Sequence, residues 1–105
     1  MGSAITLKQL RYLVAVADAR HFGQAAAACH ISQPSLSAQV QQLEETLGLQ
    51  VFERSGRRVL PTPAGAAVIA QARRVLPEVD ALAAMARDAD APLAGDFRLG
   101  VIPTL

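Results

Sequence analysis

One stretch of the sequence, residues 32–48, carries both the start and the stop of a helix, and it restricts the fold more than any other. Ser32 is a favourable N-cap, Pro34 is tolerated in a first helical turn, and Gly48 is a natural stop. Between these signals the apolar residues are spaced by four, three and four positions, as on one helix face: Leu36, Val40, Leu43 and Leu47. The stretch predicts a short helix whose apolar face packs on neighbouring elements.

Two further helices are predicted before this stretch, with connections of only a few residues between them. Thr6 and Gln9 can form a capping box. This box predicts a helix over about residues 7–19, in which the apolar residues at helical spacing are Leu7, Leu10, Val14 and Ala17. Four consecutive alanines predict a short helix over about residues 23–29 that packs very closely on its neighbours.

The sequence after Gly48 changes from a helical to a β-type pattern. Residues 51–54 and 59–62 are short β-type runs around a segment that contains glycine, and Pro61 suits an edge strand. These runs predict a small hairpin with a basic tip, whose arginines are Arg54, Arg57 and Arg58. Three helices followed by such a hairpin, or wing, make a winged helix-turn-helix, so the predicted fold is mainly α.

A long helix is predicted to follow the hairpin. Thr62 is a cap, Pro63 opens the helix, and the helical pattern continues to about residue 89. Pro77 inside this helix must either kink it or break it near Arg73. The apolar residues form a heptad seam, made of Val68, Ala72, Val75, Val79, Leu82 and Ala86, with Ile69, Leu76 and Ala83 beside it.

The heptad seam has two interpretations, an internal packing face or a contact with a second copy of the chain. A helix of about 27 residues is roughly 40 Å long, which is more than a small domain can cover. An exposed apolar stripe of this length needs a partner. We therefore expect a homodimer through this helix, although heptads alone do not set the relative direction of the two helices.

Basic residues are concentrated in the amino-terminal part of the chain. Eight basic and four acidic residues precede Pro77, whereas two basic and five acidic residues follow, within a net charge of +1. The basic part suggests a polyanionic partner.

No apolar run approaches the length of a membrane span, and Lys8 and Arg11 interrupt the first apolar stretch. Because Cys29 is the only cysteine, we expect a cytoplasmic protein without a membrane segment.

The outer face of the helix over residues 33–47 is small and almost uncharged. Small side chains allow close approach to another surface, glutamine can pair with an adenine edge, and serine can bond to a base or a phosphate. The free N–H groups of a first turn suit a phosphate. Solvated surface is the alternative interpretation. We expect this helix to enter a DNA major groove, with the candidate contacts Gln33, Pro34, Ser35, Ser37, Ala38, Gln41 and Gln42.

Five short motifs lie along the chain in an order that is typical of one protein family. They are HF-x-x-AA at residues 21–26, SQPSLS at 32–37, LEETLG at 43–48, FER at 52–54 and TPAG at 62–65. Together they resemble the amino-terminal domain of LysR-type transcriptional regulators, over residues 7 to about 89. The segments CHISQPSLS and GVIPTL further resemble the OxyR-like, peroxide-responsive subgroup of that family.

The resemblance assigns roles to individual residues. Arg54 is the wing arginine of the FER motif, and a basic wing can hold the phosphate backbone or reach into a minor groove. Family members often carry arginine where this chain has Gln24, Ala38 or Gln41, so those phosphate or guanine contacts are absent here. The residues implied to contact bases and phosphates are Gln33, Pro34, Ser35 and Ser37.

The resemblance also implies partners and a division of the chain. The family binds promoter DNA as dimers joined by the long helix and acts as tetramers, and RNA polymerase is a further possible partner. We expect a winged helix-turn-helix over residues 5–62, a linker helix over 63–90, and a hinge with the first strand of a missing regulatory domain over 91–105, the strand being Phe97 to Ile102. Residues 1–4 have the composition of an expression-tag remnant.

Functions other than DNA binding fit the sequence less well. Cys29 is expected to pack as a small apolar residue, and His21 and His30 are expected to be cap or surface residues, because their spacing does not suit a metal. Arg73 and Arg74 are expected to be solvated or paired with Glu78. The sequence contains no phosphate-binding glycine loop and no catalytic set, so we expect no enzyme, cofactor or metal site. A protein-binding winged helix remains the rival of a DNA-binding one.

Overall fold

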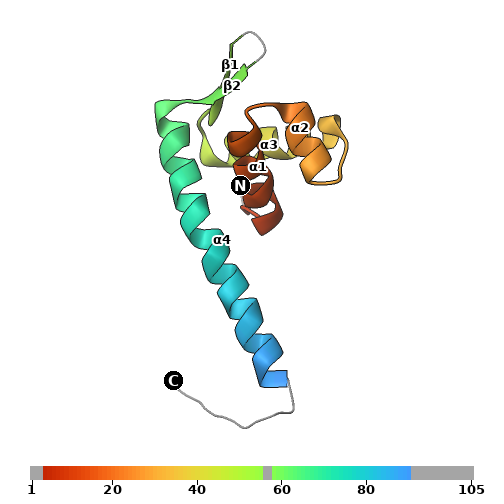
Figure 1. Ribbon diagram of the computed structural model, residues 1–105. Coiled ribbons are helices and arrows are strands. Elements are labelled where there is room, and N and C mark those ends of the chain that lie inside the picture. The colour runs from red at the N-terminus through yellow and green to blue at the C-terminus, as the bar shows by residue number, and fades with distance from the viewer. Residues whose placement is uncertain (1–3, 56–57, 91–105) are drawn as a thin grey trace.

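The computed structural model describes residues 4–55 and 58–90 of the chain (Figure 1). A cluster of short helices carries a hairpin on one side, and a long helix runs past the cluster and projects beyond it (Figure 1). In chain order the elements are α1 (Leu7–Ala19), α2 (Phe22–Ala28), α3 (Gln33–Leu47), β1 (Phe52–Ser55), β2 (Arg58–Pro61) and α4 (Pro63–Asp90). The predicted winged helix-turn-helix is confirmed, and α2 begins and ends one residue earlier than expected.

Local sequence signals determine where the helices begin and end. The Thr6 Oγ1 accepts a hydrogen bond from the Gln9 N–H at 3.0 Å, and the Gln9 Oε1 accepts one from the Thr6 N–H at 3.1 Å, which completes the predicted capping box. Ser32 caps α3 by accepting from the Ser35 N–H at 3.2 Å. Helix α3 stops at Gly48, whose φ of 72° is a left-handed conformation that glycine adopts without strain.

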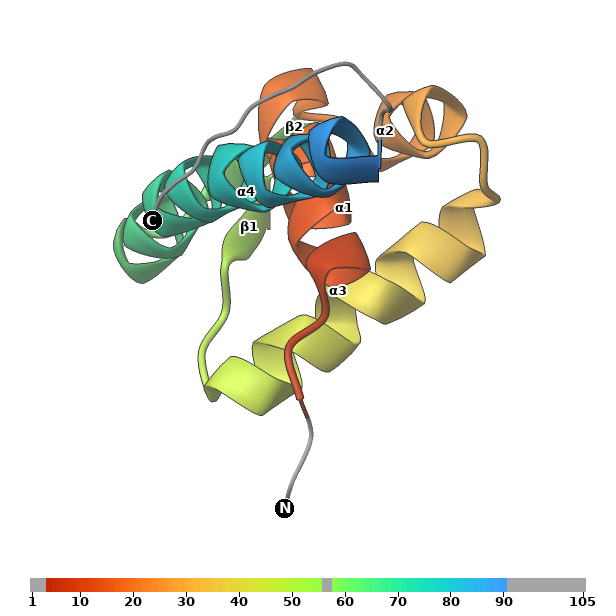
Figure 2. The same ribbon diagram turned by 90° about the horizontal axis from the view of Figure 1, so that it is seen from below.

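The core is aliphatic, and α1 lies at its centre, packed against α2, α3 and α4 (Figure 2). Leu13 and Val16 of α1 are completely buried, together with three of the four predicted core residues of α3, which are Leu36, Val40 and Leu43. Leu47 is half-buried. The pattern on α1 was misleading, because Leu7 is 41 % exposed, whereas Leu10, Val14 and Ala17 are half-buried. Helices cover α1 from several directions, so no single stripe of residues defines its buried side.

The wing is an antiparallel pair of strands in which Arg54 of β1 lies opposite Val59 of β2. Its base is fixed to the helices because the Val59 N–H donates to the carbonyl oxygen of Arg20, just after α1, at 3.3 Å. Phe52 and Val59 are buried and join the wing to the core. Arg57, which was predicted at the tip, lies outside the described residues, and so does the predicted strand over residues 97–102.

Helix α4 runs for 28 residues without interruption through Pro77. Of the two outcomes expected for Pro77, a break of the helix near Arg73 is therefore wrong. Pro77 is exposed, so water can bond to the carbonyl that the proline ring leaves without an N–H partner. The first half of α4 buries Ile69, Ala72 and Leu76 against the helical cluster, whereas the second half projects beyond it (Figure 1).

Two ion pairs join α4 to α1. The guanidinium of Arg73 lies 2.7 Å from the carboxylate of Asp18, and that of Arg11 lies 3.1 Å from Asp80. Arg73 is exposed, as expected, but its partner is Asp18 and not Glu78, because the helix packing brings Asp18 within reach. These side chains are about half exposed or more, so each pair stabilises the packing by less than about 1 kcal/mol.

Candidate nucleic-acid interface

The first turns of α3 present a polar surface to solvent. Gln33, Pro34 and Ser35 are exposed, Ser37 is half-buried, and the predicted outer face continues through the exposed residues Ala38, Gln41 and Gln42. Ser32 and Ser35 are joined by their hydroxyl oxygens at 2.9 Å, which orders the start of the helix. Six of these seven predicted contact residues of α3 are thus exposed, while two leucines and the valine of the same helix are buried.

The amino-terminal end of α2 lies directly against the start of α3. A Cβ atom built on Gly23 would lie 3.3 Å from the Gln33 Oε1 and 2.9 Å from the His21 Cε1, so only glycine leaves both side chains where they are. The Gln33 amide oxygen therefore lies beside the start of α2. Sequence patterns on α3 alone could not show this contact, because it joins residues of two helices.

The side chain of Gln42 is exposed, but a hydrogen bond restricts its orientation. Its Oε1 accepts a hydrogen bond from the Nε2 of Gln9 at 3.4 Å. Gln9 is 3 % exposed, and its own Oε1 is held by the Thr6 N–H. The Gln42 amide is therefore oriented with its NH₂ group away from Gln9, ready to donate to an acceptor outside the protein.

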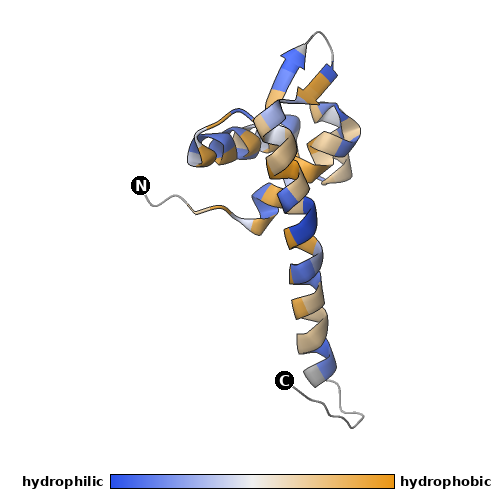
Figure 3. Ribbon diagram, turned by 90° about the vertical axis from the view of Figure 1, so that its left-hand side faces the viewer, coloured by the Kyte–Doolittle hydropathy of each residue, from blue (hydrophilic) through white to orange (hydrophobic). Residues whose placement is uncertain are grey.

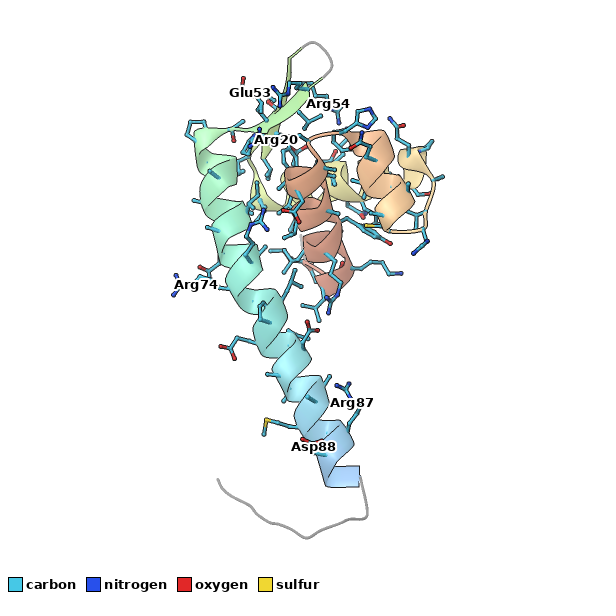
Figure 4. All side chains as sticks on the ribbon, viewed as in Figure 1. Arg20, Glu53, Arg54, Arg74, Arg87 and Asp88 are labelled. Carbon is cyan, nitrogen blue, oxygen red and sulfur yellow. The ribbon has the colours of Figure 1, made fainter. Side chains whose placement is uncertain are left out.

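The wing places one arginine beside the helices. The Arg54 guanidinium carbon lies 4.5 Å from the centre of the Phe22 ring, a cation–π contact with the first residue of α2 (Figure 4). Arg58, on the other strand, is exposed. The structure does not describe Arg57, so it places two of the three predicted wing arginines.

A polar cleft of about 380 Å³ separates α3 from the wing. It is lined by Phe22, Gln41, Glu44, Gln50, Phe52 and Arg54. The predicted contacts Gln41 and Arg54 therefore open onto the same space. Glu44 lies in the LEETLG motif, and its contacts could not be predicted from the motif: its Oε2 accepts from the N–H groups of Val51 and Phe52 at 2.7 and 3.2 Å.

The predicted dimer seam is only partly available on the surface of α4. Ala72 is 2 % exposed and belongs to the core of its own subunit, and Val68, Val75 and Val79 are half-buried. Leu82 is 65 % exposed and Ala86 is also exposed. Met85, which lies outside the seam, is 67 % exposed. Apolar segments continue along the projecting part of α4, where no element of its own subunit covers them in the described residues (Figure 3).

The histidines and the cysteine lie at the ends of α2. The His21 Nδ1 accepts from the Gln24 N–H at 3.0 Å, which makes His21 the N-cap, as expected. His30 is exposed beyond the helix, and Cys29 is the half-buried C-cap. In residues 4–55 and 58–90, no three His, Cys, Asp or Glu side chains are placed to hold a metal ion. No helix in the same part of the chain is long and apolar enough to span a membrane.

Comparison with known proteins decides what this arrangement is. Residues 7–66 match the family described as bacterial regulatory helix-turn-helix proteins, lysR family. The chain belongs to the LysR family. It carries the DNA-binding domain of a LysR-family transcription regulator, in which α1, α2 and α3 with the β1–β2 hairpin form the winged helix-turn-helix.

Curated LysR-family relatives are similar over nearly the whole chain. The hydrogen peroxide-inducible genes activator of Pectobacterium carotovorum subsp. carotovorum is 46 % identical over 101 residues, covering 96 % of this chain and 33 % of that protein. The DNA-binding transcriptional dual regulator OxyR of Escherichia coli K12 gives the same identity and coverage. The chain thus spans about a third of the length of these relatives.

Solved LysR-family structures have the same fold. A variant of full-length OxyR from Pseudomonas aeruginosa is 44 % identical, with a TM-score of 0.82, over 87 % of this chain and 31 % of that one. The DNA-binding domain of CbnR, solved in complex with DNA, is 38 % identical, with a TM-score of 0.76, over 82 % of this chain and 99 % of that one.

Proposed function

We propose that the chain reads a specific DNA sequence by placing the first turns of α3 in the major groove. The observation that carries this proposal is the exposed turn of Gln33, Pro34 and Ser35, which begins a helix whose other side is buried and which lies against the start of α2. Glutamine and serine side chains on a firmly packed helix can discriminate base edges. The DNA-binding domain that contains α3 corresponds to residues 5–62.

Phosphate contacts in the proposal come from the basic groups around α3. Arg54 lies next to the cleft that Gln41 also lines, so a DNA strand beside α3 passes within reach of the wing. Arg58 is exposed on the neighbouring strand. The N–H groups at the start of α3 add a site of positive potential for a phosphate.

We further propose that two copies bind together through α4, the linker helix of residues 63–90. The exposed Leu82 and Ala86, with the half-buried Val79, supply an apolar face on the projecting half of the helix, and Val75 continues it toward the helical cluster. Two DNA-binding domains joined through α4 favour an operator with two related half-sites, that is, an interrupted palindrome. Tetramers and contact with RNA polymerase are proposals for a longer protein that contains this domain.

The relatives suggest the signal to which the longer protein responds. The curated proteins with 46 % identity are hydrogen peroxide-inducible genes activators, and the similarity covers 96 % of the chain. We propose that this domain belongs to a regulator of peroxide-inducible genes. Cys29 has no part in this proposal, because it is a half-buried helix cap.

Selection of bound sequences from a random duplex library, at about 150 mM salt, tests the DNA-reading function. We expect an interrupted palindrome to be enriched. No enrichment by a folded, dimeric protein would reject sequence-specific binding by this chain and favour a protein partner for the outer face of α3.

A further inference from the structure

The side-chain carboxylate of Glu44, in α3, binds the backbone at the start of the wing. Its Oε2 accepts hydrogen bonds from the N–H groups of Val51 at 2.7 Å and Phe52 at 3.2 Å. Hydrogen bonds to an ionised acceptor are stronger than those between neutral groups. Because Val51 and Phe52 lead into β1, these two bonds attach the first wing strand directly to the helix that presents the outer polar face.

The attachment continues from Phe52 to the wing arginine. The Phe52 ring meets the Phe22 ring edge to face, with the ring centres 6.3 Å apart and the planes at 78°. The Arg54 guanidinium in turn rests over the Phe22 ring at 4.5 Å. The position of the guanidinium therefore depends on two packed rings, and the backbone of one of these rings is held by Glu44.

The charge of Glu44 is unfavourable for the surface on which it lies. Glu44 lines the cleft that also contains Arg54 and Gln41, so its carboxylate faces the space beside the proposed DNA path. A negative charge there repels a polyanion. The benefit that offsets this repulsion must come from geometry, that is, from the two backbone N–H groups it binds.

We propose that Glu44 is a positioning residue for DNA binding, which fixes the angle between α3 and the wing and so holds Arg54 beside the outer face of α3. This inference rests on the proposed function and assigns it a residue that does not itself contact DNA. Without Glu44 the start of β1 loses both of its hydrogen bonds to α3, so Arg54 is held less firmly beside the outer face of α3 even though Thr62 and Val59 still anchor the wing.

Glu44 can act on DNA binding through its charge or by positioning Arg54, and the two roles predict opposite changes in duplex affinity when the charge is removed. Glu44→Gln keeps the shape but removes the charge that strengthens both hydrogen bonds. Charge alone predicts tighter binding of a mixed-sequence duplex, whereas positioning predicts binding weaker by about three- to tenfold, the effect of one typical lost hydrogen bond. Fluorescence anisotropy with the 105-residue chain measures the difference.

Glu45 supplies the matched control. It is the next residue of α3 and is exposed, and among the described residues its side chain has no hydrogen bond or ion pair. Glu45→Gln removes the same charge from the same helix, so it should tighten duplex binding. If Glu44→Gln also tightens binding, the positioning role is rejected.

A second set of variants separates positioning from general damage to the fold. In an Arg54→Ala background, Glu44→Gln should weaken duplex binding no further, because the group that it positions is already absent. Phe22→Leu keeps an apolar side chain but removes the ring beneath the guanidinium, so it too should weaken binding only when Arg54 is present. Urea unfolding identifies any variant whose loss of binding comes from instability. Phe22→Leu tests the last step, the contact of the ring with Arg54, even if Glu44→Gln does not fold.

The outcomes distinguish this inference from the proposed function. The positioning role is overturned if Glu44→Gln or Phe22→Leu weakens duplex binding in the Arg54→Ala background by as much as it does in the unchanged protein. If the unchanged, folded chain binds neither the selected operator nor mixed-sequence duplex, the proposed function itself fails. Weakening that depends on Arg54, with tighter binding by Glu45→Gln, supports both.

Discussion

Gln33 illustrates how one side chain depends on a residue of another helix. Its amide oxygen lies beside Gly23, at a place where a Cβ atom on that residue would crowd it. A glutamine whose rotamers are limited by a close neighbour loses less conformational entropy on binding than an unrestricted one. Residues of this kind favour discrimination between sequences, whereas flexible basic residues mainly add affinity for any DNA.

Gln33→Ala is expected to weaken binding to the selected operator by about five- to a hundredfold, because a good base contact is worth about 1–3 kcal/mol of discrimination. Binding to mixed-sequence duplex should change much less. Gln71→Ala is a matched control, because Gln71 is exposed on α4, away from the outer face of α3. Equal losses on both duplexes would show that Gln33 does not read bases.

Arg54→Ala is expected to weaken binding to every duplex and to reduce the slope of log affinity against log salt by about one unit, as for one lost phosphate contact. Arg74→Ala removes the same charge from α4, where the side chain points away from the helical cluster (Figure 4). Titrations at several salt concentrations give both slopes. A slope that Arg54→Ala leaves unchanged would exclude a phosphate contact by this arginine.

At the scale of elements, the winged unit depends on close packing between the first turn of α4 and the backbone that leads into the wing. A Cβ atom on Gly65 would lie 1.9 Å from the carbonyl oxygen of Val51, a distance that no packing rearrangement of a side chain can relieve. Glycine is therefore required in the first turn of α4 for the backbones to meet. The TPAG motif marks this position, and the structure supplies its physical reason.

Gly65→Ala is expected to destabilise the folded domain by about 1–3 kcal/mol or more, the usual effect of overpacking a rigid site. The added methyl group must push the start of α4 away from residue 51. Urea unfolding monitored by circular dichroism measures the change, with Ala64→Ser as a control at an exposed neighbour. An unchanged midpoint for Gly65→Ala would mean that the two backbones are not in contact in solution.

The sequence was sufficient for features that are encoded within a few residues of each other. Ser32, Gly48 and the Thr6–Gln9 box act on their own helix, so the bounds of α1 and α3 could be predicted from them. The pairing of Arg73 with Asp18 spans 55 positions, and it exists only after α4 has packed on α1. For the same reason, the sequence alone could not identify the bonds of Glu44 or the contact of Arg54 with Phe22.

At the scale of the whole molecule, α4 is too long for the domain to which it belongs. Its 28 residues correspond to about 42 Å. The helical cluster covers the first half, where Ile69, Ala72 and Leu76 are buried, and leaves Leu82 and Met85 on the surface of the second half. An assembly in which another copy covers this half removes that apolar area from water.

Leu82→Asp is expected to raise the dissociation constant of the homodimer by at least about tenfold, since central apolar contacts dominate such interfaces and an unpaired charge is costly there. Ala81→Asp is the matched control, because Ala81 is exposed on another side of the same turn. Analytical ultracentrifugation of the two variants measures the monomer fraction. Dimers that tolerate Leu82→Asp as well as Ala81→Asp would place the interface elsewhere.

Thr62 joins the long helix to the wing with almost no slack. Its N–H donates to the Val51 carbonyl at 2.9 Å, while its hydroxyl donates to the Gln50 carbonyl at 2.6 Å and accepts from the Gly65 N–H at 2.8 Å. No flexible linker therefore separates α4 from the hairpin. Because the first half of α4 also packs on α1, a force that displaces the start of α4 acts on the hairpin and on the helical cluster together.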